Sequence, residues 1–203
     1  MARPRAFDEG TALEAAMQRF WADGYAATSV RDLGAAMGLS QASVYNAFGA
    51  KRALFTRCLD HYLDANMRAR IARLETTLPP RQAIEAFLHE IVERSLESRL
   101  GCLLANAALE VAPHDADIAD VVAERMAELE GFFRRSVVAG QRDGSVSGTV
   151  DPIATAQLLL TTVMGLRVLA RGYPQRSLLE GAARQALSVL GAPPTTTTPG
   201  NAP

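Results

Sequence analysis

Apolar residues recur at helical spacing along almost the whole chain, whereas the strict alternation typical of β-strands is almost absent. Leu13, Met17 and Phe20, for example, share one stripe of a helix predicted between residues 8 and 23. Glycine and proline divide this pattern, and Asp151-Pro152 is a clear helix start because an N-cap residue precedes proline. The sequence therefore predicts an all-α fold of about nine helices.

The same start and stop signals place the other predicted helices. Thr28 is expected to be the N-cap of the second helix, and Gly38 and Gly49 are expected to end the second and third. Residues 191–203, rich in proline and threonine, are expected to form a disordered tail. The approximate predicted bounds are 28–37, 40–48, 50–76, 80–98, 102–111, 115–140, 152–171 and 177–190.

Composition excludes several classes of protein. With two cysteines, Cys58 and Cys102, the chain has neither a disulfide-stapled scaffold nor a CxxC zinc module. The first residues have no apolar core and carry acids, which is unlike a signal peptide. The longest purely apolar runs fall well short of the roughly 18 residues of a membrane span. We expect a soluble, cytoplasmic protein with no membrane partner.

The sequence contains none of the local motifs that indicate common enzyme chemistries. GxSxG, P-loop, GxGxxG and HExxH patterns are all absent. His89 and Glu93 lie four residues apart on one predicted helix, but a single such pair is usually a solvated face. We therefore expect no enzyme activity, no metal site and no cofactor.

The net charge of −1 hides an asymmetry between the two ends of the chain. Residues 1–57 carry seven basic and five acidic side chains, a balance of +2, and the remainder carries 14 and 17, a balance of −3. A basic head on an acidic body is consistent with a nucleic-acid partner, although the difference is small.

Residues 30–48 meet the steric requirements of a helix-turn-helix. Two short helices that cross steeply need a small residue where they touch, and Gly34 supplies it. The turn needs a residue that tolerates positive φ, and Gly38 supplies that. The inner positions are all apolar: Leu33, Met37, Leu39, Val44 and Ala47. The pattern as a whole favours this motif over two unrelated short helices.

The second helix of the motif is expected to enter the major groove of DNA. Gln41 and Asn46 can pair with adenine, and the methyl group of Ala42 can contact thymine. Phosphates are expected to be bound by Thr28, Ser43, Tyr45 and Lys51, and a basic arm at Arg3 and Arg5 adds further positive charge.

Residues 28–55 resemble the DNA-binding signature of TetR-family transcriptional regulators. The matching positions are Thr28, Gly38, Ser40, Tyr45, Phe48, Lys51 and Leu54. Residues 101–106 and 165–170 also resemble segments of one branch of that family. Two positions depart from it: Ala47 replaces a common phosphate-contacting histidine, and Ala50 replaces a common capping serine or aspartate.

The resemblance implies a homodimeric repressor that binds double-stranded DNA and is released by a small-molecule effector. It implies a DNA-binding domain at residues 1–49 and an effector-binding and dimerisation domain at residues 50–190. A dimer is also expected on physical grounds, since one recognition helix contacts few base pairs and two on a twofold axis contact a near-palindrome.

The last two helices are the expected dimer interface. The first of them is apolar around much of its circumference, more than a one-sided surface helix needs, although a core helix of a monomer has the same pattern. Gly165 and Ala170 are expected to allow a partner helix to approach. The apolar residues are Leu158, Leu159, Leu160, Val163, Met164, Leu166 and Val168.

The effector is expected to lie between helices of the second domain and to be mostly apolar. Methionine and phenylalanine make adaptable apolar walls, and Asn106 is expected to be the polar group inside, although each candidate also fits an ordinary core. The candidate lining residues are Met67, Phe87, Ile91, Asn106, Met126, Phe133 and Met164.

Two alternatives remain from the sequence. Cys102 follows Arg99 and Gly101 at a predicted helix N-terminus, where the macrodipole and a nearby cation favour a thiolate. This position suits a redox or electrophile sensor, or simply a buried structural cysteine. The second alternative is a helical adaptor that binds other proteins and whose DNA-binding motif is vestigial.

Overall fold

A computed structural model describes residues 7–191, and every regular element within them is helical, which confirms the predicted all-α class. The predicted arm at Arg3 and Arg5 and the predicted tail from residue 192 onward lie outside the described residues. In chain order the elements are α1 (Glu9–Asp23), α2 (Val30–Met37), α3 (Gln41–Phe48), α4 (Lys51–Leu63), the π-helical turn η1 (Asp64–Arg68), α5 (Ala69–Thr77), α6 (Pro80–Glu97), α7 (Leu103–Glu110), the 3₁₀ turn η2 (Ala112–His114), α8 (Ala116–Arg142), α9 (Pro152–Gly172) and α10 (Arg176–Ser188).

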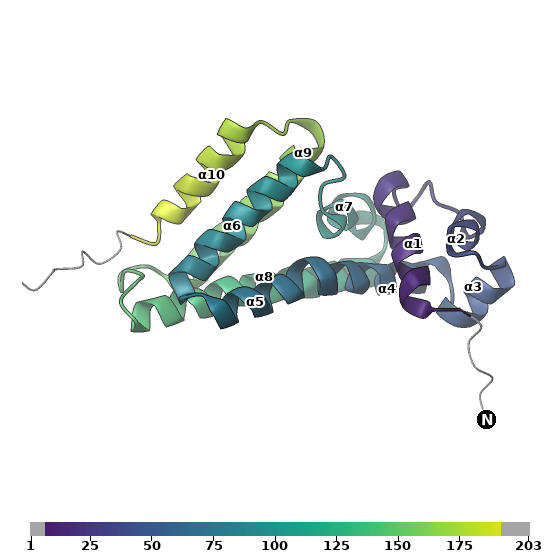
Figure 1. Cartoon of the computed structure of the whole chain (residues 1–203), viewed down its shortest axis with the longest axis horizontal. Coiled ribbons are helices and arrows are strands. Elements are labelled where there is room, and N and C mark those ends of the chain that lie inside the picture. Colours follow the sequence, from purple (N-terminus) through teal and green to yellow (C-terminus); the bar gives the residue numbers. More distant parts are fainter. Residues whose placement is uncertain (1–6, 192–203) are drawn as a thin grey trace, which may run out of the picture.

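Helices α4 and α5 form one continuous rod because η1 joins them without a break. Counted this way, residues 7–191 contain nine α-helical rods, the number predicted. The rod runs beside α8 along the length of the molecule (Figure 1), and α6, α9 and α10 stand together at the end away from α1–α3.

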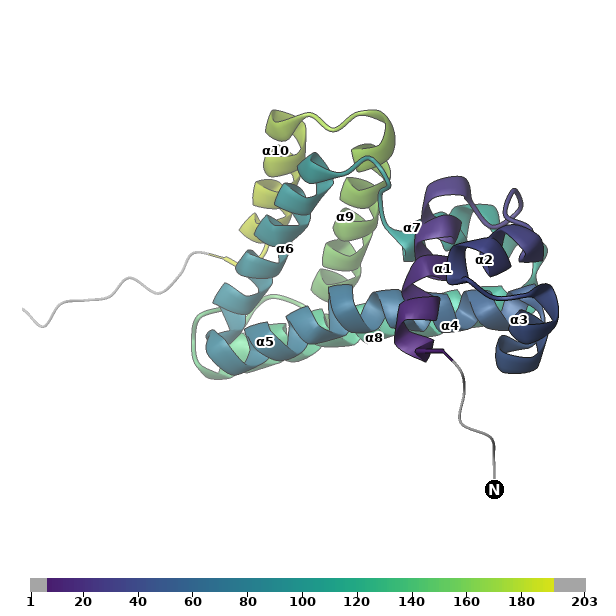
Figure 2. The same cartoon turned by 45° about the vertical axis from the view of Figure 1, so that its right-hand side comes forward.

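The head consists of α1, α2, α3 and the first turns of α4, which lie together at one end of the molecule (Figure 2). Its core contains Phe20 of α1, whose ring meets Phe55 of α4 edge to face at 5.1 Å. Tyr25 closes the end of α1 by stacking on Phe20 with a centroid distance of 5.9 Å. Leu33 and Val44 are fully buried between α2 and α3, as the helix-turn-helix pattern predicts.

The turn between α2 and α3 depends on two glycines. A Cβ on Gly34 would stand 2.7 Å from the carbonyl oxygen of Leu39, so the two helices touch through backbone at this point. Gly38 ends α2 in the left-handed conformation at φ +66°, which glycine adopts without strain. The predicted roles of both glycines in the motif are thus explained by their geometry.

The N-cap of α2 differs from the prediction, because Ser29 rather than Thr28 occupies it. Ser29 and Asp32 form a reciprocal capping box, in which the Ser29 hydroxyl accepts from the Asp32 amide and the Asp32 carboxylate accepts from the Ser29 amide. Thr28 is only 2% exposed, and its hydroxyl donates to the Gly24 carbonyl at 2.6 Å. Burial of the Thr28 side chain therefore moves the cap by one residue.

The body is built around α8 and α9, which pack against each other and against α6. Phe87 of α6 meets Phe132 and Phe133 of α8 at centroid distances of 5.3 and 5.4 Å. Within residues 7–191, α9 is the single helix whose length and apolar composition would suit a membrane span. In this fold one face of α9 packs on α6, α8 and α10 and buries the Arg167 side chain, and the other face is exposed.

Replacing Gly34 by alanine is expected to lower the free energy of unfolding by about 1–3 kcal/mol, because the new methyl group would push the Leu39 carbonyl away. Urea denaturation followed by circular dichroism measures this change. Gly10→Ala is the matched control, since a Cβ there meets nothing closer than 3.5 Å. We expect the control to hold or raise stability. Equal behaviour of the two variants would contradict the backbone contact.

Candidate functional site

The outer face of α3 carries the side chains that the sequence assigns to base contacts. Gln41, Ala42 and Asn46 are exposed, and Tyr45 is 52% exposed although it is a large aromatic residue. Ser43 is half-buried, with its hydroxyl 2.9 Å from that of Ser40, the N-cap of the helix. The structure therefore brings these five predicted residues together on one exposed helix.

Lys51 lies at the first position of α4, with its ammonium 4.3 Å above the ring of Tyr25. Burial lowers the pKa of Lys51, and the nearby Glu110 carboxylate opposes this change. No side chain caps α4, because residue 50 is alanine, so the first amide groups of the helix have no side-chain acceptor. Thr28 lies inside the head rather than on this surface.

Most cations of the described head already have partners inside the protein. Arg19 pairs with Asp23 at 2.8 Å, Arg52 pairs with Asp115 and Asp117, and Arg57 pairs with Glu9. Within residues 7–191, no carboxylate oxygen lies within 4 Å of the charged groups of Arg31 or Lys51. Arg31 is exposed on α2, and the sequence analysis did not select it.

Arg57 of α4 links that helix to α1 and α3. Its guanidinium pairs with Glu9, the first residue of α1, donates to the Ala47 carbonyl of α3 at 3.3 Å, and lies 4.9 Å from the centroid of the Phe48 ring. These contacts tie the position of α3 to that of α4.

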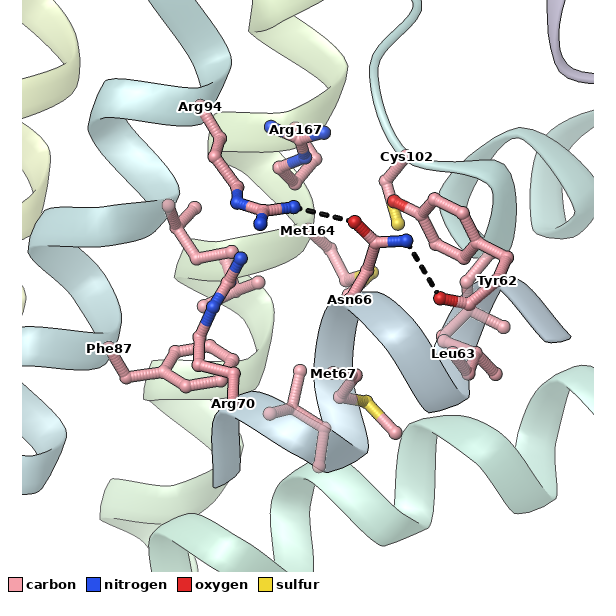
Figure 3. Close-up of a pocket in the computed structure, with 14 residues that line it drawn as sticks. Tyr62, Leu63, Asn66, Met67, Arg70, Phe87, Arg94, Cys102, Met164 and Arg167 are labelled. Carbon is pink, nitrogen blue, oxygen red and sulfur yellow. Dashed lines mark hydrogen bonds between the residues drawn. The ribbon is translucent and has the colours of Figure 1, made fainter. Parts of the chain in front are cut away.

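A small cavity lies in the body, between the α4–α5 rod, α6, α9 and the segment before α7 (Figure 3). Its volume is about 40 Å³, which is room for a few water molecules. Four of the predicted effector residues line it: Met67, Phe87, Ile91 and Met164. They form an apolar wall together with Leu63, Leu104, Leu129 and Val163.

Three predicted lining residues lie elsewhere. The Asn106 amide donates to the Leu100 carbonyl at 3.1 Å. The same carbonyl accepts a hydrogen bond from Trp21 of α1, so Asn106 lies at the junction between the body and the head. Phe133 is fully buried among the aromatic rings of the body, and Met126 is partly buried against the core of α8. None of the three touches the cavity.

The polar groups of the cavity are instead Asn66 and three arginines, Arg70, Arg94 and Arg167. Arg94 donates to the Asn66 side-chain oxygen at 2.5 Å, and the Asn66 amide donates to the Tyr62 carbonyl at 2.8 Å (Figure 3). The sequence analysis missed the arginines. A usable signal existed for Arg167, because it lies four residues after Val163 on the inward face of α9.

Tyr62 connects this cavity directly to the head. Its ring lines the cavity and also meets Trp21 of α1 edge to face at a centroid distance of 5.0 Å. The next turn of the rod is the π-helical η1, which carries Asn66 and Met67 into the same cavity. The cavity therefore contacts α1 through the Tyr62 side chain, and it contacts α4 at the C-terminal end of that helix.

Ion pairs hold the rod against α8 around η1. Arg68 of η1 binds Glu128 of α8 at 2.8 Å and Asp64 of its own turn at 2.7 Å, and Arg125 of α8 binds Asp60 of α4 at 2.9 Å. The hydrogen bond from Arg68 lowers the pKa of the Glu128 carboxyl. The π turn is thus fixed from outside while its inner residues line the cavity.

The two cysteines differ in their surroundings. Cys58 is fully buried, its thiol points to the Leu13 carbonyl at 3.8 Å, and burial raises the pKa of this thiol. Cys102 is 9% exposed and lines the cavity beside Tyr62. Cys102 is the N-cap residue of α7, but its side chain makes no hydrogen bond to the amides of that helix.

No group of three or more potential metal ligands was found within residues 7–191. Glu93, which the sequence pairs with His89, binds Arg176 at 2.6 Å, and this hydrogen bond lowers the pKa of Glu93.

An exposed stripe of small and apolar residues follows one face of α9. Its members are spaced alternately by four and three residues, as on one side of a helix that meets another. A Cβ on Gly165 would meet nothing within 4 Å, whereas Ala170, which was expected beside it, is fully buried within the chain. The stripe consists of Ala154, Leu158, Thr161, Gly165, Val168 and Gly172.

Comparisons with known proteins agree with this arrangement. Residues 12–58 match the family model of bacterial regulatory proteins of the tetR family, and residues 80–186 match the tetracyclin repressor-like C-terminal domain. The HTH-type transcriptional regulator YezE of Bacillus subtilis is 30% identical over 193 residues, covering 94% of this chain and all of YezE. The HTH-type transcriptional repressor ComR of Escherichia coli is 29% identical, covering 83% of this chain and 82% of ComR.

Among solved structures, a cysteine mutant of the TetR family transcriptional regulator CifR, complexed with 26-base-pair operator DNA, is 35% identical. The match covers 91% of this chain and 98% of that one, with a TM-score of 0.81.

The two thiols are expected to react at different rates with iodoacetamide under native conditions. Cys102 is expected to be alkylated first, because Cys58 has no exposed surface and a raised pKa. Mass spectrometry of tryptic peptides over time measures both rates in one sample. In urea both thiols are expected to react alike, and Cys102→Ser should leave a nearly inert native protein. Alkylation of Cys58 at the rate of Cys102 would contradict this burial.

Proposed function

Because this chain belongs to the TetR family of bacterial transcriptional regulators, we propose that it is a repressor that binds a near-palindromic operator as a homodimer and is released by a small molecule. The exposed polar face of α3 is the observation that carries this proposal. We further propose that it acts in the cytoplasm, where its DNA is, and has no enzyme activity.

Base contacts are assigned to Gln41, Ala42 and Asn46. Their exposed side chains offer amide groups for adenine and a methyl group for thymine in the major groove. Tyr45 and Ser43 are assigned to phosphates. Lys51 joins them because no carboxylate oxygen lies within 4 Å of its ammonium in the described chain and because it lies at an uncapped helix start.

The dimer is assigned to the exposed stripe of α9 and the adjoining face of α10. Leu158 and Val168 are 41% and 44% exposed, and Leu178 of α10 is 40% exposed. Small residues such as Gly165 allow two helices to approach closely, and apolar neighbours gain from leaving water. A twofold axis here would place two recognition helices on one face of a duplex.

The release mechanism follows from the shared rod. Helix α4 is tied to the recognition helix by Arg57 in its middle and lines the cavity with Tyr62 and Leu63 at its C-terminal end. A ligand that enlarges the cavity would displace this end of the rod or η1. The spacing of the two heads would then no longer match two half-sites, and affinity for the operator would fall.

The two alternatives give different outcomes in the same experiments. An adaptor with a vestigial motif would show no sequence preference on DNA. A thiol sensor would respond to oxidants or electrophiles through Cys102 and would lose that response in Cys102→Ser, whereas the proposed regulator responds to a bound ligand in both proteins.

Purified protein is expected to bind DNA from the region upstream of its own gene more tightly than a scrambled duplex, with steep loss of affinity as salt rises. Fluorescence anisotropy at two salt concentrations measures both properties. Lys51→Ala should weaken binding to all sequences and make the salt slope shallower by about one. Gln41→Ala should cost about 1–3 kcal/mol and relax the preference at one base position.

Arg134→Ala is the matched control for lost positive charge, because Arg134 is exposed on α8, far along the chain from the head. It is expected to bind as the unmodified protein does. Binding without any sequence preference, or equal losses in the Arg134 and Lys51 variants, would contradict the assigned interface.

Val168→Glu is expected to convert the dimer to a monomer, because it places a charge in the apolar stripe of α9. Size-exclusion chromatography with light scattering measures the mass, and operator affinity should fall with it. Leu109→Glu is the control, since Leu109 is 65% exposed on α7 and does not belong to the stripe of α9 or to α10. A monomeric unmodified protein, or a dimer that survives Val168→Glu, would contradict this interface.

A further inference from the structure

The cavity in the body has an unusual charge for a space lined mostly by apolar groups. Three arginines, Arg70, Arg94 and Arg167, contribute to its lining, and no aspartate or glutamate does. They come from α5, α6 and α9, and Figure 3 shows their guanidiniums on the same side of the cavity, around Asn66. The cavity therefore has a cationic end built from three separate helices.

Only one of these cations has a counter-ion within residues 7–191. Arg70 pairs with Glu90 at 3.1 Å, and Glu90 is shared with Arg73 at 2.6 Å. No carboxylate oxygen lies within 4 Å of Arg94 or Arg167 in this range. Burial, together with the positive charge of Arg94, lowers the pKa of Arg70 to about 10, with Arg167 adding to the effect.

The buried Arg167 is the stronger sign of an anion site. Its side chain is 6% exposed, and its hydrogen bonds go to uncharged groups, the Ser95 hydroxyl at 3.1 Å, the Gly101 carbonyl and Tyr62. A buried cation without a counter-ion is costly, and a bound anion would offset that cost. Arg94 makes one hydrogen bond, to Asn66, although a guanidinium carries five N–H donors.

The rest of the cavity is apolar and adaptable. Phe87 and Ile91 of α6 face Met67 of η1 and Met164 of α9, and the two methionines can change rotamer at little cost. A volume of about 40 Å³ does not hold an organic ligand, so these side chains must move when one enters. Such a wall fits a hydrocarbon or aromatic body.

We propose that the effector of this protein is an amphipathic monocarboxylate, whose acid group binds Arg94 and Arg167 and whose apolar body lies against Phe87, Ile91 and the two methionines. The planar guanidinium fork matches a carboxylate with two parallel hydrogen bonds, which favours this anion over a neutral polar group. The proposal rests on the proposed function, since it specifies the ligand of the same cavity. It adds an acid group to the mostly apolar effector expected from the sequence.

The exchange of partners also suggests how the ligand acts on the rod. A carboxylate that binds the edge of the Arg94 guanidinium facing Asn66 would displace the Asn66 oxygen from its bond to α6. Asn66 belongs to η1, directly after α4, so one link between the rod and α6 would be lost where the ligand enters, while the Arg70–Glu90 ion pair remains. The charge of the arginine is meanwhile better neutralised than before.

The test uses carboxylic acids of six to ten carbons, straight-chain and phenyl-substituted, each paired with its primary amide. The acid and amide share shape and differ in charge. Isothermal titration calorimetry with the purified protein, without DNA, measures each dissociation constant. At least one acid is expected to bind about tenfold or more tightly than its amide, because a charge-assisted hydrogen bond is lost in the amide.

Arg94→Met is expected to remove this preference for acid over amide, and Arg94→Lys should keep part of it, since the charge remains without the fork. Arg94 is an exposed residue whose side chain bonds to Asn66 alone among the described residues, so the variant is expected to fold, which a thermal melt checks. Arg99→Met is the matched control, because Arg99 is an exposed arginine outside the cavity, and it should bind acids and DNA unchanged.

Acids that bind no more tightly than their amides, acids that do not bind at millimolar concentration, or a preference that survives Arg94→Met would each overturn the proposal. These outcomes are separate from the proposed function, because the titration contains no DNA. If an amide alone released the operator in the anisotropy assay, the regulator would stand and the acid group would be wrong. If acids bound but the protein had no sequence preference on DNA, the acid-binding site would stand and the proposed repressor function would be wrong.

Discussion

Helix α4 buries its apolar face in the head and in the body at once, and this double packing is the constraint on which the rest of the molecule depends. Phe55 meets Phe20 of α1 in the core of the head, while Tyr62, two turns further along, meets Trp21 on one side and the cavity on the other. A helix held in this way cannot shift at one end alone, because well-packed interiors do not deform continuously. The head and the cavity are therefore mechanically one system.

The helix-turn-helix was predictable because its requirements are local. Gly34, Gly38 and Ser40 act within a few residues of themselves, and the structure gives them the contact, the positive φ and the cap that the pattern predicts. The N-cap of α2 was not predicted correctly. Thr28 and Ser29 are both good caps, and the choice depends on whether the Thr28 side chain is buried under the turn, which no local pattern reports.

The cavity was only partly predictable, because it is made by residues far apart in the chain. Met67, Phe87, Ile91 and Met164 were found since they lie on inward-facing stripes. Asn106 lies on such a stripe too, but a loop carbonyl from Leu100 satisfies it, and this contact depends on tertiary structure. The arginines were not predicted, because charged side chains usually lie on the surface. Arg167, however, lies on the apolar, inward face of α9 and is buried. The assigned DNA contacts, dimer face and effector remain predictions.

The π turn of the rod has a consequence for how tolerant this chain is to changes in length. A π turn holds one residue more than an α turn, and the Ala69 amide accordingly bonds to the Asp64 carbonyl five residues back. Deletion of a single residue between Asp64 and Arg68 would let the rod continue as an ordinary α-helix, and α5 would keep nearly its present face because the π turn had absorbed the extra residue. Arg70 would stay on the side of Glu90, whereas Asn66 and Met67, which the π turn carries into the cavity, would be rearranged. The part of the cavity wall that comes from this turn thus depends on one surplus amino acid.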